Sequence, residues 1–209
     1  MPTPKQARSE LSTSRLLDAA ADLIAEGGYE RMTLSAIAKR AGYTHGLVTS
    51  RFGSKEGLLW ALVERMVVDW GHTLLLPTVA DQAGAAAIHT TIAALRDSWR
   101  RAPSRMRSLY ILMFEALMPI PLLHQRMAEL HRELRCGVQD AIERGISDGS
   151  VSSRIDSAGV ARLVVGALRG AVYQAMLDPE EVSMDDALAD VEVMVNAILP
   201  GPSRSTPGR

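Results

Sequence analysis

Residues 33–52, TLSAIAKRAGYTHGLVTSRF, decide how this chain folds. Thr33 and Thr44 each precede a short amphipathic segment, and a threonine at such a position caps a helix by accepting a hydrogen bond from an amide of the first turn. Gly42 stands where the first segment needs a residue in the left-handed conformation. The stretch therefore predicts two short helices joined by a tight turn, which is the helix-turn-helix arrangement of many DNA-binding proteins.

The second of these helices has one small and polar face. A rotation of about 100° per residue puts Val48 on its apolar side. The opposite arc consists of His45, Gly46, Thr49 and Ser50. A helix that enters the major groove, which is about 12 Å wide, gains from short hydrogen-bonding groups and from a glycine that permits close approach. We therefore expect His45, Thr49 and Ser50 to read base edges.

The flanks of the two helices are suited to phosphate. Helix N-termini present free amides and the positive end of the helix dipole, which favour anions, and Thr33 and Thr44 mark both N-termini. Arg51 and Lys55 add positive charge at and beyond the end of the second helix. We expect these four residues to contact the DNA backbone without reading its sequence.

The segment YTHGLVTSRFGSKEGLL, which follows TLSAIAKRAG, makes the pattern more specific. Together the two segments resemble the TetR family of bacterial repressors, and the resemblance extends over residues 10–70. The matching positions are Thr33, Ile37, Ala38, Ala41, Gly42, Thr44, Gly46, Phe52, Lys55, Glu56 and Leu58. The resemblance implies an N-terminal DNA-binding domain, a helical ligand-sensing region, and a homodimer whose C-terminal helices form an intersubunit four-helix bundle.

Three positions depart from the family pattern. The family usually has tyrosine where this chain has Thr49, and commonly a small aliphatic residue where it has Tyr43. Arg51 stands where histidine is frequent and adds electrostatic attraction to DNA. We expect the fold to survive these differences and the DNA contacts around Thr49 to differ from those of relatives. The alternative function is a helical sensory or protein-interaction module with lost or altered DNA binding.

Apolar residues recur at helical spacing along almost the whole chain, and the period-two alternation typical of strands is missing. Glycines and prolines separate the apolar segments. We expect an all-α protein with about nine helices, at residues 12–26, 34–41, 45–52, 55–72, 82–101, 104–117, 121–147, 156–177 and 184–198.

The pattern also predicts two domains. Residues 10–70 are expected to form a three-helix DNA-binding domain with its helix-turn-helix at residues 33–52. Residues 71–199 are expected to form a larger helical domain for ligand binding and dimerisation. The polar ends of the chain, residues 1–9 and 200–209, are expected to be disordered.

A single reader helix contacts only a few base pairs, so specific binding generally needs two copies on half-sites about 34 Å apart or a multiple of that spacing. We therefore expect a homodimer on a palindromic double-stranded DNA operator. The candidate dimer surface is the apolar segment 158–177, in which Gly166 and Gly170 permit close approach of another helix. The alternative is that this segment is the centre of its own core, because helices that are apolar all round are usually buried.

A ligand cavity is indicated by residues 99–134, which mix flexible and aromatic apolar side chains. Methionines adapt to irregular ligands, although the same residues at helical spacing also fill ordinary cores. Our candidate lining residues are Trp99, Tyr110, Met113, Phe114, Leu117, Met127, His131 and Tyr173. Such a lining predicts a hydrophobic or amphipathic small-molecule effector that releases the protein from its operator.

Composition excludes several other classes. The 209 residues are 47% hydrophobic and 22% charged, which is typical of a soluble globular protein. The lone Cys136 excludes an intramolecular disulfide, as is usual in a reducing cytosol. The first ten residues lack the apolar stretch of a secretory signal, and no run of about 18 uncharged apolar residues follows. We expect a cytoplasmic protein with no membrane partner.

Two further patterns suggest chemistry but lack its context. Residues 145–149, GISDG, match the G-x-S-x-G nucleophile elbow, which requires a preceding strand, whereas here the motif closes an expected helix. His124 and His131 lie seven residues apart, a poor spacing for one metal ion with ligand distances of about 2 Å. We expect no enzyme activity, no metal site and no cofactor.

Overall fold

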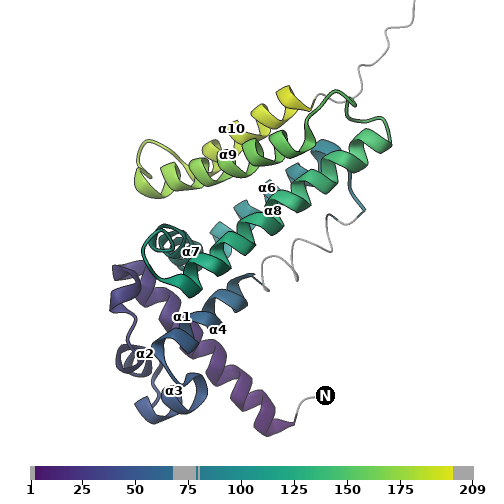
Figure 1. The fold of residues 1–209 in the computed structure, drawn as a ribbon. Helices are drawn as coiled ribbons and strands as arrows, with labels where there is room; N and C mark the ends of the chain where they lie inside the picture. The colour runs from purple at the N-terminus through teal and green to yellow at the C-terminus, as the bar shows by residue number, and fades with distance from the viewer. Residues whose placement is uncertain (1–2, 68–78, 80, 200–209) are drawn as a thin grey trace, which may run out of the picture. The chain divides into compact units, whose positions relative to one another are not determined.

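The computed structural model describes residues 3–67, 79 and 81–199, which fold into nine α-helices (Figure 1). The all-α class and the number of helices predicted from the sequence are confirmed for these residues. The helices divide between two compact units. The first unit contains the described residues within 1–70 and 102–127, and the second contains those within 71–101 and 128–209.

The first unit is built around a long N-terminal helix. Its elements are α1 (Pro4–Arg31), α2 (Leu34–Ala41), α3 (His45–Phe52), α4 (Lys55–Val67), α7 (Pro103–Glu115) and the beginning of α8 (Pro121–Ser147). α1 packs along α7 and also contacts α2 and α4. The fully buried side chains that hold this unit together include Leu16, Ile24, Met32, Ile37, Leu58, Leu62 and Leu112.

α1 begins earlier than the sequence analysis predicted. We expected the helix from residue 12 and a disordered tail over residues 1–9, but the helix starts at Pro4. The Thr3 hydroxyl accepts a hydrogen bond from the Gln6 amide at 3.3 Å, and the Gln6 side chain accepts one from the Thr3 amide at 2.8 Å. This reciprocal capping box, followed by proline at the first helical position, stabilises a start that the polar residues after it do not reveal.

The end of α1, expected at residue 26, lies at Arg31, because the helix resumes after the non-helical Gly27 and Gly28. Other predicted boundaries are close to those observed, and some lie outside the described residues. Residues 68–72 of the expected fourth helix are outside them, as are residues 1–2 and the expected C-terminal tail at 200–209. The caps predicted for α2 and α3 are present, because Thr33 and Thr44 each accept a hydrogen bond from the amide three residues later. Ser54 caps α4 in the same way.

The second unit contains α6 (Gly84–Arg101), the remainder of α8, α9 (Ser157–Leu177) and α10 (Met184–Ile198). α10 packs against both α9 and α6. Asp156 and Ser183 cap α9 and α10 by accepting hydrogen bonds from amides at 3.0 Å. The buried core of the second unit includes Ile88, Ile92, Ile142, Val164, Val172, Leu188 and Val195.

The G-x-S-x-G stretch belongs to the packing of this second unit. A Cβ atom on Gly145 would lie 2.9 Å from the Cα atom of Gly84, so glycine is needed where α6 and α8 approach each other. Ser147 is the last residue of α8, and its hydroxyl donates to the Glu143 carbonyl at 3.0 Å. The motif therefore ends a helix, as expected, and lacks the strand context of a nucleophile elbow.

α9 divides its apolar residues between two faces. Several apolar residues of the segment that we expected at a dimer surface are instead buried within the unit, among them Val160, Val164, Leu168, Ala171, Val172 and Ala175. By length and composition α9 would also be able to cross a membrane, but a core helix of a soluble protein passes the same test. The other face carries Leu163 and Leu177, which are 59% and 68% exposed. Packing in the core of the unit thus accounts for the buried face of α9 but not for the exposed leucines on its other face.

Candidate nucleic-acid interface

α2 and α3 form a capped helix pair joined by a glycine turn. Gly42 adopts φ 73° and ψ 33°, the left-handed conformation that glycine favours, and its amide donates to the Ala38 carbonyl at the end of α2. Ile37 and Val48 are completely buried, one from each helix. The local sequence therefore produces the helix-turn-helix geometry that its spacing predicted.

The outer face of α3 consists of the residues that we expected to meet DNA bases. His45, Gly46, Thr49 and Ser50 are all exposed, whereas Val48 lies on the buried side. The Thr49 hydroxyl donates to the His45 carbonyl at 3.1 Å and lies 3.3 Å from Nε2 of the His45 ring. This contact places the His45 and Thr49 side chains next to each other on the outer face.

Gly46 has no role in the internal packing of the first unit. Its backbone is helical, so the position does not need the conformational freedom of glycine. Apart from the adjoining backbone of α3, no atom of the described residues lies within 4 Å of where a Cβ atom would stand. A larger residue would raise helix propensity by about 0.5–1 kcal/mol. Glycine at this position keeps the outer face of α3 flat, which favours close approach of another molecule.

Arg51 contacts α1 instead of pointing away from the protein. Its guanidinium donates to the Ser9 carbonyl and to the Thr13 hydroxyl, in the N-terminal part of α1. These contacts hold the end of α3 against α1. The linear sequence does not indicate Ser9 or Thr13 as partners of Arg51, because they lie 42 and 38 residues away from it.

Lys55 and Arg40 are also engaged within the protein. The Lys55 ammonium lies 3.9 Å from the centre of the Tyr29 ring and 3.9 Å from a Glu30 carboxylate oxygen. Arg40 donates to both carboxylate oxygens of Glu26, and these hydrogen bonds hold the pKa of the Glu26 carboxyl below its usual value. The positive charge near α2 and α3 is therefore partly committed to the fold, and phosphate contacts by Arg51 and Lys55 stay predictions.

The predicted ligand residues are distributed over both units. Tyr110 and Met127 are buried in the first unit, and Met113 is partly exposed there. Phe114 and Leu117, also in the first unit, are 51% and 79% exposed. The second unit holds Trp99 and His131, which are partly exposed, and Tyr173, which is 41% exposed. Sequence spacing predicted helices that carry these residues but gave no means of telling core from surface among them.

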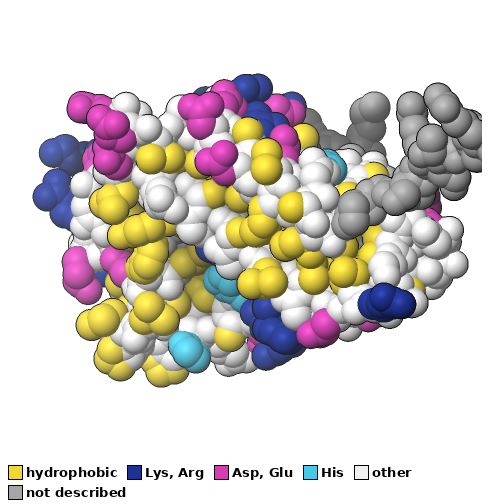
Figure 2. All heavy atoms as spheres, turned by 90° about the horizontal axis from the view of Figure 1, so that it is seen from above, with side chains coloured by type: hydrophobic (Ala, Val, Ile, Leu, Met, Phe, Trp, Pro, Cys, Tyr) yellow, Lys and Arg dark blue, Asp and Glu magenta, His cyan; other side chains and the backbone are white. Residues whose placement is uncertain are grey.

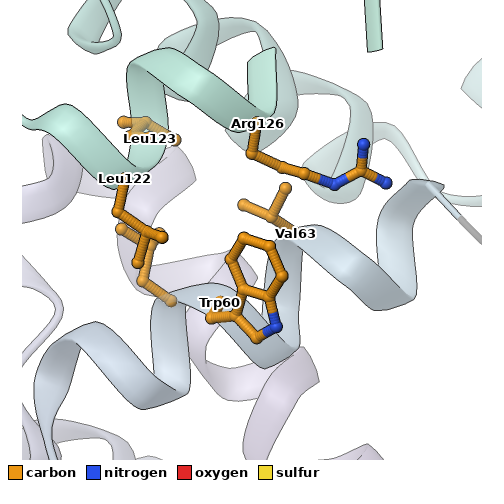
Figure 3. Close-up of a pocket in the computed structure, with 6 residues that line it drawn as sticks. Trp60, Val63, Leu122, Leu123 and Arg126 are labelled. Atoms are coloured by element: carbon orange, nitrogen blue, oxygen red, sulfur yellow. The ribbon is translucent and has the colours of Figure 1, made fainter. Parts of the chain in front are cut away.

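A small hollow in the first unit lies between α4 and α8 (Figure 3). Trp60 and Val63 of α4 face Leu122 and Arg126 of α8, with Leu59 and Leu123 completing the lining. The hollow encloses about 10 Å³, enough for about one water molecule and far below the volume of a drug-sized ligand site. It contains none of the eight predicted ligand residues. Arg126 donates a hydrogen bond to the Glu64 carboxylate beside it.

The histidines considered for metal binding are placed otherwise. The Nδ1 atom of His124 lies 3.1 Å from the Ala116 carbonyl oxygen, where it can donate a hydrogen bond. Within residues 3–67, 79 and 81–199, no three His, Cys, Asp or Glu side chains gather in a way that could hold a metal ion.

The capped helix pair, its glycine turn and its exposed polar face together define a helix-turn-helix DNA-binding transcriptional regulator. Residues 16–62 match the family described as "Bacterial regulatory proteins, tetR family", and residues 103–200 match "BetI-type transcriptional repressor, C-terminal". The chain belongs to the TetR family of bacterial transcriptional regulators, with a BetI-type C-terminal region. This family is not enzymatic, in agreement with the interpretation of the sequence.

Relatives resemble the chain over most of its length. The HTH-type transcriptional regulator BetI of Burkholderia cenocepacia is 28% identical over 181 residues, which cover 84% of this chain and 90% of that protein. Among solved structures, the SmeT–triclosan complex has 25% identity, a TM-score of 0.76 and 90% coverage of both chains. The FadR regulator of Bacillus subtilis in complex with stearoyl-CoA has 20% identity and a TM-score of 0.72, over 87% of this chain and 96% of that one, which shows a shared fold.

Proposed function

We propose that this regulator is a repressor that binds operator DNA through the outer face of α3 and is released by a small-molecule effector. The observation that carries the proposal is Gly46, because a glycine that the fold does not need stands in the middle of an exposed face of short polar residues. Such a face fits the edges of bases in the major groove. His45, Thr49 and Ser50 would read bases, and Thr33, Thr44, Arg51 and Lys55 would contact phosphate.

The functional unit in this proposal is a homodimer in the cytoplasm, bound to a palindromic operator. Its support is a stripe on the second face of α9, which we call the α9 stripe and which consists of Leu163, Gly166, Gly170, Tyr173 and Leu177. Apart from the adjoining backbone of α9, none of the described residues has an atom within 4 Å of a Cβ position at Gly166 or Gly170, so they leave room for close approach of another helix. Figure 2 shows hydrophobic side chains at the surface of one face, interspersed with polar and charged ones.

The proposed effector is hydrophobic or amphipathic. Two structural relatives are described in complex with such molecules, triclosan for SmeT and stearoyl-CoA for FadR. Residues 71–199 of this chain, with the apolar side chains predicted to line a site, would provide the ligand-binding and dimerisation domain. Effector binding would favour a state of the dimer in which the two α3 helices no longer fit successive major grooves. The size of this shift is limited by the difference in the affinity of the effector for the DNA-binding state and the released state.

The test is a gel shift with a random pool of DNA duplexes at fixed, modest salt, repeated until bound sequences are enriched. The proposal predicts enrichment of a defined sequence, and then release of that complex by an apolar or amphipathic compound but not by a polar one. A folded dimer that enriches no sequence would contradict the proposal and favour a sensory or protein-interaction module.

A further inference from the structure

The last turn of α7 holds the point where α1 bends. Gly27 and Gly28 leave helical geometry, with φ −161° and ψ 22° at Gly27 and φ 75° and ψ 179° at Gly28. The amide of Tyr29, directly after the bend, donates to Oε1 of Glu115 at 2.9 Å, across 86 residues of sequence. A side chain thus supplies an acceptor to a backbone amide at the interruption of the helix.

The backbone conformation of Gly28 and its lack of a side chain permit this contact. Its positive φ is a conformation that residues with a side chain rarely adopt, and a Cβ atom there would lie 3.0 Å from Oε1 of Glu115. The bend and the carboxylate therefore fit each other closely. Neither is explained by the packing of α1 alone.

The bend leads directly into the DNA reader. The Tyr29 carbonyl accepts a hydrogen bond from the Met32 amide at 3.1 Å, and the Arg31 carbonyl accepts one from the Thr33 amide at 3.0 Å. Thr33 is the N-cap of α2. Successive hydrogen bonds therefore extend from Glu115 to the first turn of the helix-turn-helix.

Tyr29 also meets α4, the helix that follows the reader. Its side chain is only 9% exposed, and the Lys55 ammonium at the start of α4 lies over its ring. A shift of Tyr29 would therefore displace both the residues that precede α2 and those that follow α3.

Glu115 is an unfavourable residue for stability alone. Its second oxygen, Oε2, is buried and has no hydrogen-bond partner among the described residues. Burying half of a carboxylate without a partner costs free energy, and such exceptions often mark functional positions. The retention of a carboxylate here calls for a role beyond packing.

We propose that Glu115 is a positioning residue for DNA binding, which fixes Tyr29 and so sets the direction in which the chain enters α2. The inference rests on the proposed function, because it assumes that α3 reads DNA. Glu115 itself touches no DNA in this proposal. It acts through the backbone of residues 29–33.

The first test measures the affinity of the full-length dimer for a duplex selected from a random pool by the wild-type protein. Glu115→Ala should weaken binding roughly tenfold, the loss of one charge-assisted hydrogen bond, with dimer content and helical content unchanged. Glu115→Gln keeps an accepting oxygen at Oε1 and should stay within about threefold of wild type. Met118→Ala, which removes an exposed side chain three residues away, is the matched control and should bind as wild type does.

A further variant at residue 115 separates the effect of side-chain length from the effect of the negative charge. Glu115→Asp keeps the carboxylate but shortens the side chain by one methylene, so it should lose the Tyr29 contact and bind like Glu115→Ala. Wild-type affinity in Glu115→Ala, or an equal loss in Glu115→Gln and Glu115→Ala, would overturn the proposal.

Hydrogen exchange tests the positioning step without DNA. In Glu115→Ala the amides of residues 29–36 should exchange faster, while those of α9 should not change. Unchanged exchange at residues 29–36 would refute the positioning role even if the DNA-binding function stands. Failure of the wild-type protein to select any duplex would instead refute the proposed function and leave this measurement interpretable. Should Glu115→Ala not fold, the comparison of Glu115→Asp with Glu115→Gln gives the same two outcomes.

Discussion

The outer face of α3 and the α9 stripe share one property and differ in another. The described part of each unit would accept a side chain at Gly46 on α3 and at Gly170 on α9, because only the helix's own backbone lies near either Cβ position. The face of α3 is short and polar, whereas the α9 stripe carries the exposed Leu163 and Leu177. Short polar groups suit the hydrated edges of DNA bases, and an exposed apolar stripe suits another protein surface. Two surfaces whose glycines have no packing role among the described residues thus indicate two different partners.

The largest expected effect is at the outer face of α3. Gly46→Glu should weaken operator binding by at least about 100-fold, because like charges brought together at an interface cost several kcal/mol. Its thermal stability should be unchanged or slightly higher, since glycine is the poorer helix former. Fluorescence anisotropy with a selected duplex and a thermal melt measure the two quantities.

Gly137→Glu is the matched control for this change. Gly137 is an exposed helical glycine of α8 that also has no atom within 4 Å of its Cβ position. The variant adds the same charge on a helix of the other unit and should bind DNA as wild type does. Equal losses in the two variants would mean that net charge, and not the face of α3, controls binding.

The next effect concerns the α9 stripe. Gly170→Arg should convert the dimer to a monomer in analytical ultracentrifugation, because a long charged side chain prevents close approach of an apolar surface. Operator affinity should fall by about tenfold or more, since a monomer occupies one half-site. Gly137→Arg serves as control and should remain dimeric. If Gly170→Arg is still a dimer with wild-type operator affinity, the α9 stripe is not the dimer surface.

A smaller effect is expected where α3 meets α1. Arg51→Ala should lower the free energy of unfolding by about 1 kcal/mol, through the loss of hydrogen bonds to Ser9 and Thr13. The slope of log affinity against log salt tests its predicted phosphate contact. A slope smaller by about 0.9 would show that Arg51 meets a phosphate in the complex, and an unchanged slope would show that it acts only by holding α3 in place.

The smallest effect is a pH dependence at the bend of α1. Burial raises the pKa of the Tyr29 phenol, and the carboxylates of Glu56, Glu30 and Glu115 add to the shift. The folded protein therefore keeps this proton at pH values where the unfolded chain has lost it. The contribution of Tyr29 to the free energy of unfolding is fully present below about pH 10, the pKa of an unfolded tyrosine. It is lost as the pH rises through the pKa of Tyr29 in the folded protein.

Tyr29→Phe isolates this contribution, because it keeps the ring under Lys55 and removes the titrating proton. Denaturant unfolding of both proteins between pH 8 and pH 11 gives the difference. The wild-type protein should lose stability faster than Tyr29→Phe above about pH 10. Parallel curves would show that the Tyr29 phenol does not contribute.

Much of the fold was predictable because its boundaries depend on local chemistry. Thr33, Gly42 and Thr44 act within one turn of their own positions, so a linear pattern suffices to place α2 and α3. The early start of α1 could have been found from the Thr3 and Gln6 capping box, but the polar residues after it lack apolar periodicity. Local rules therefore located nearly every helix end.

The candidate site was predictable only where it depends on the surface of a single helix. The exposed arc of α3 follows from rotation along the sequence, whereas the partners of Arg51 and Lys55 depend on tertiary packing. Nothing in the linear sequence singles out Glu115, because its proposed role depends on a contact with Tyr29, 86 residues away. The apolar residues of α9 look alike in the sequence, although some are buried and others exposed.

Sequence enrichment from a random duplex pool, run in parallel on the wild-type protein and Gly46→Glu, tests the central claim most directly. The account predicts that the wild-type protein enriches a palindrome with half-sites about one helical turn apart, or a multiple of it, and that Gly46→Glu enriches nothing while remaining a folded dimer. Enrichment of the same palindrome by both proteins, or of no sequence by the wild-type dimer, would contradict the claim that the outer face of α3 reads DNA.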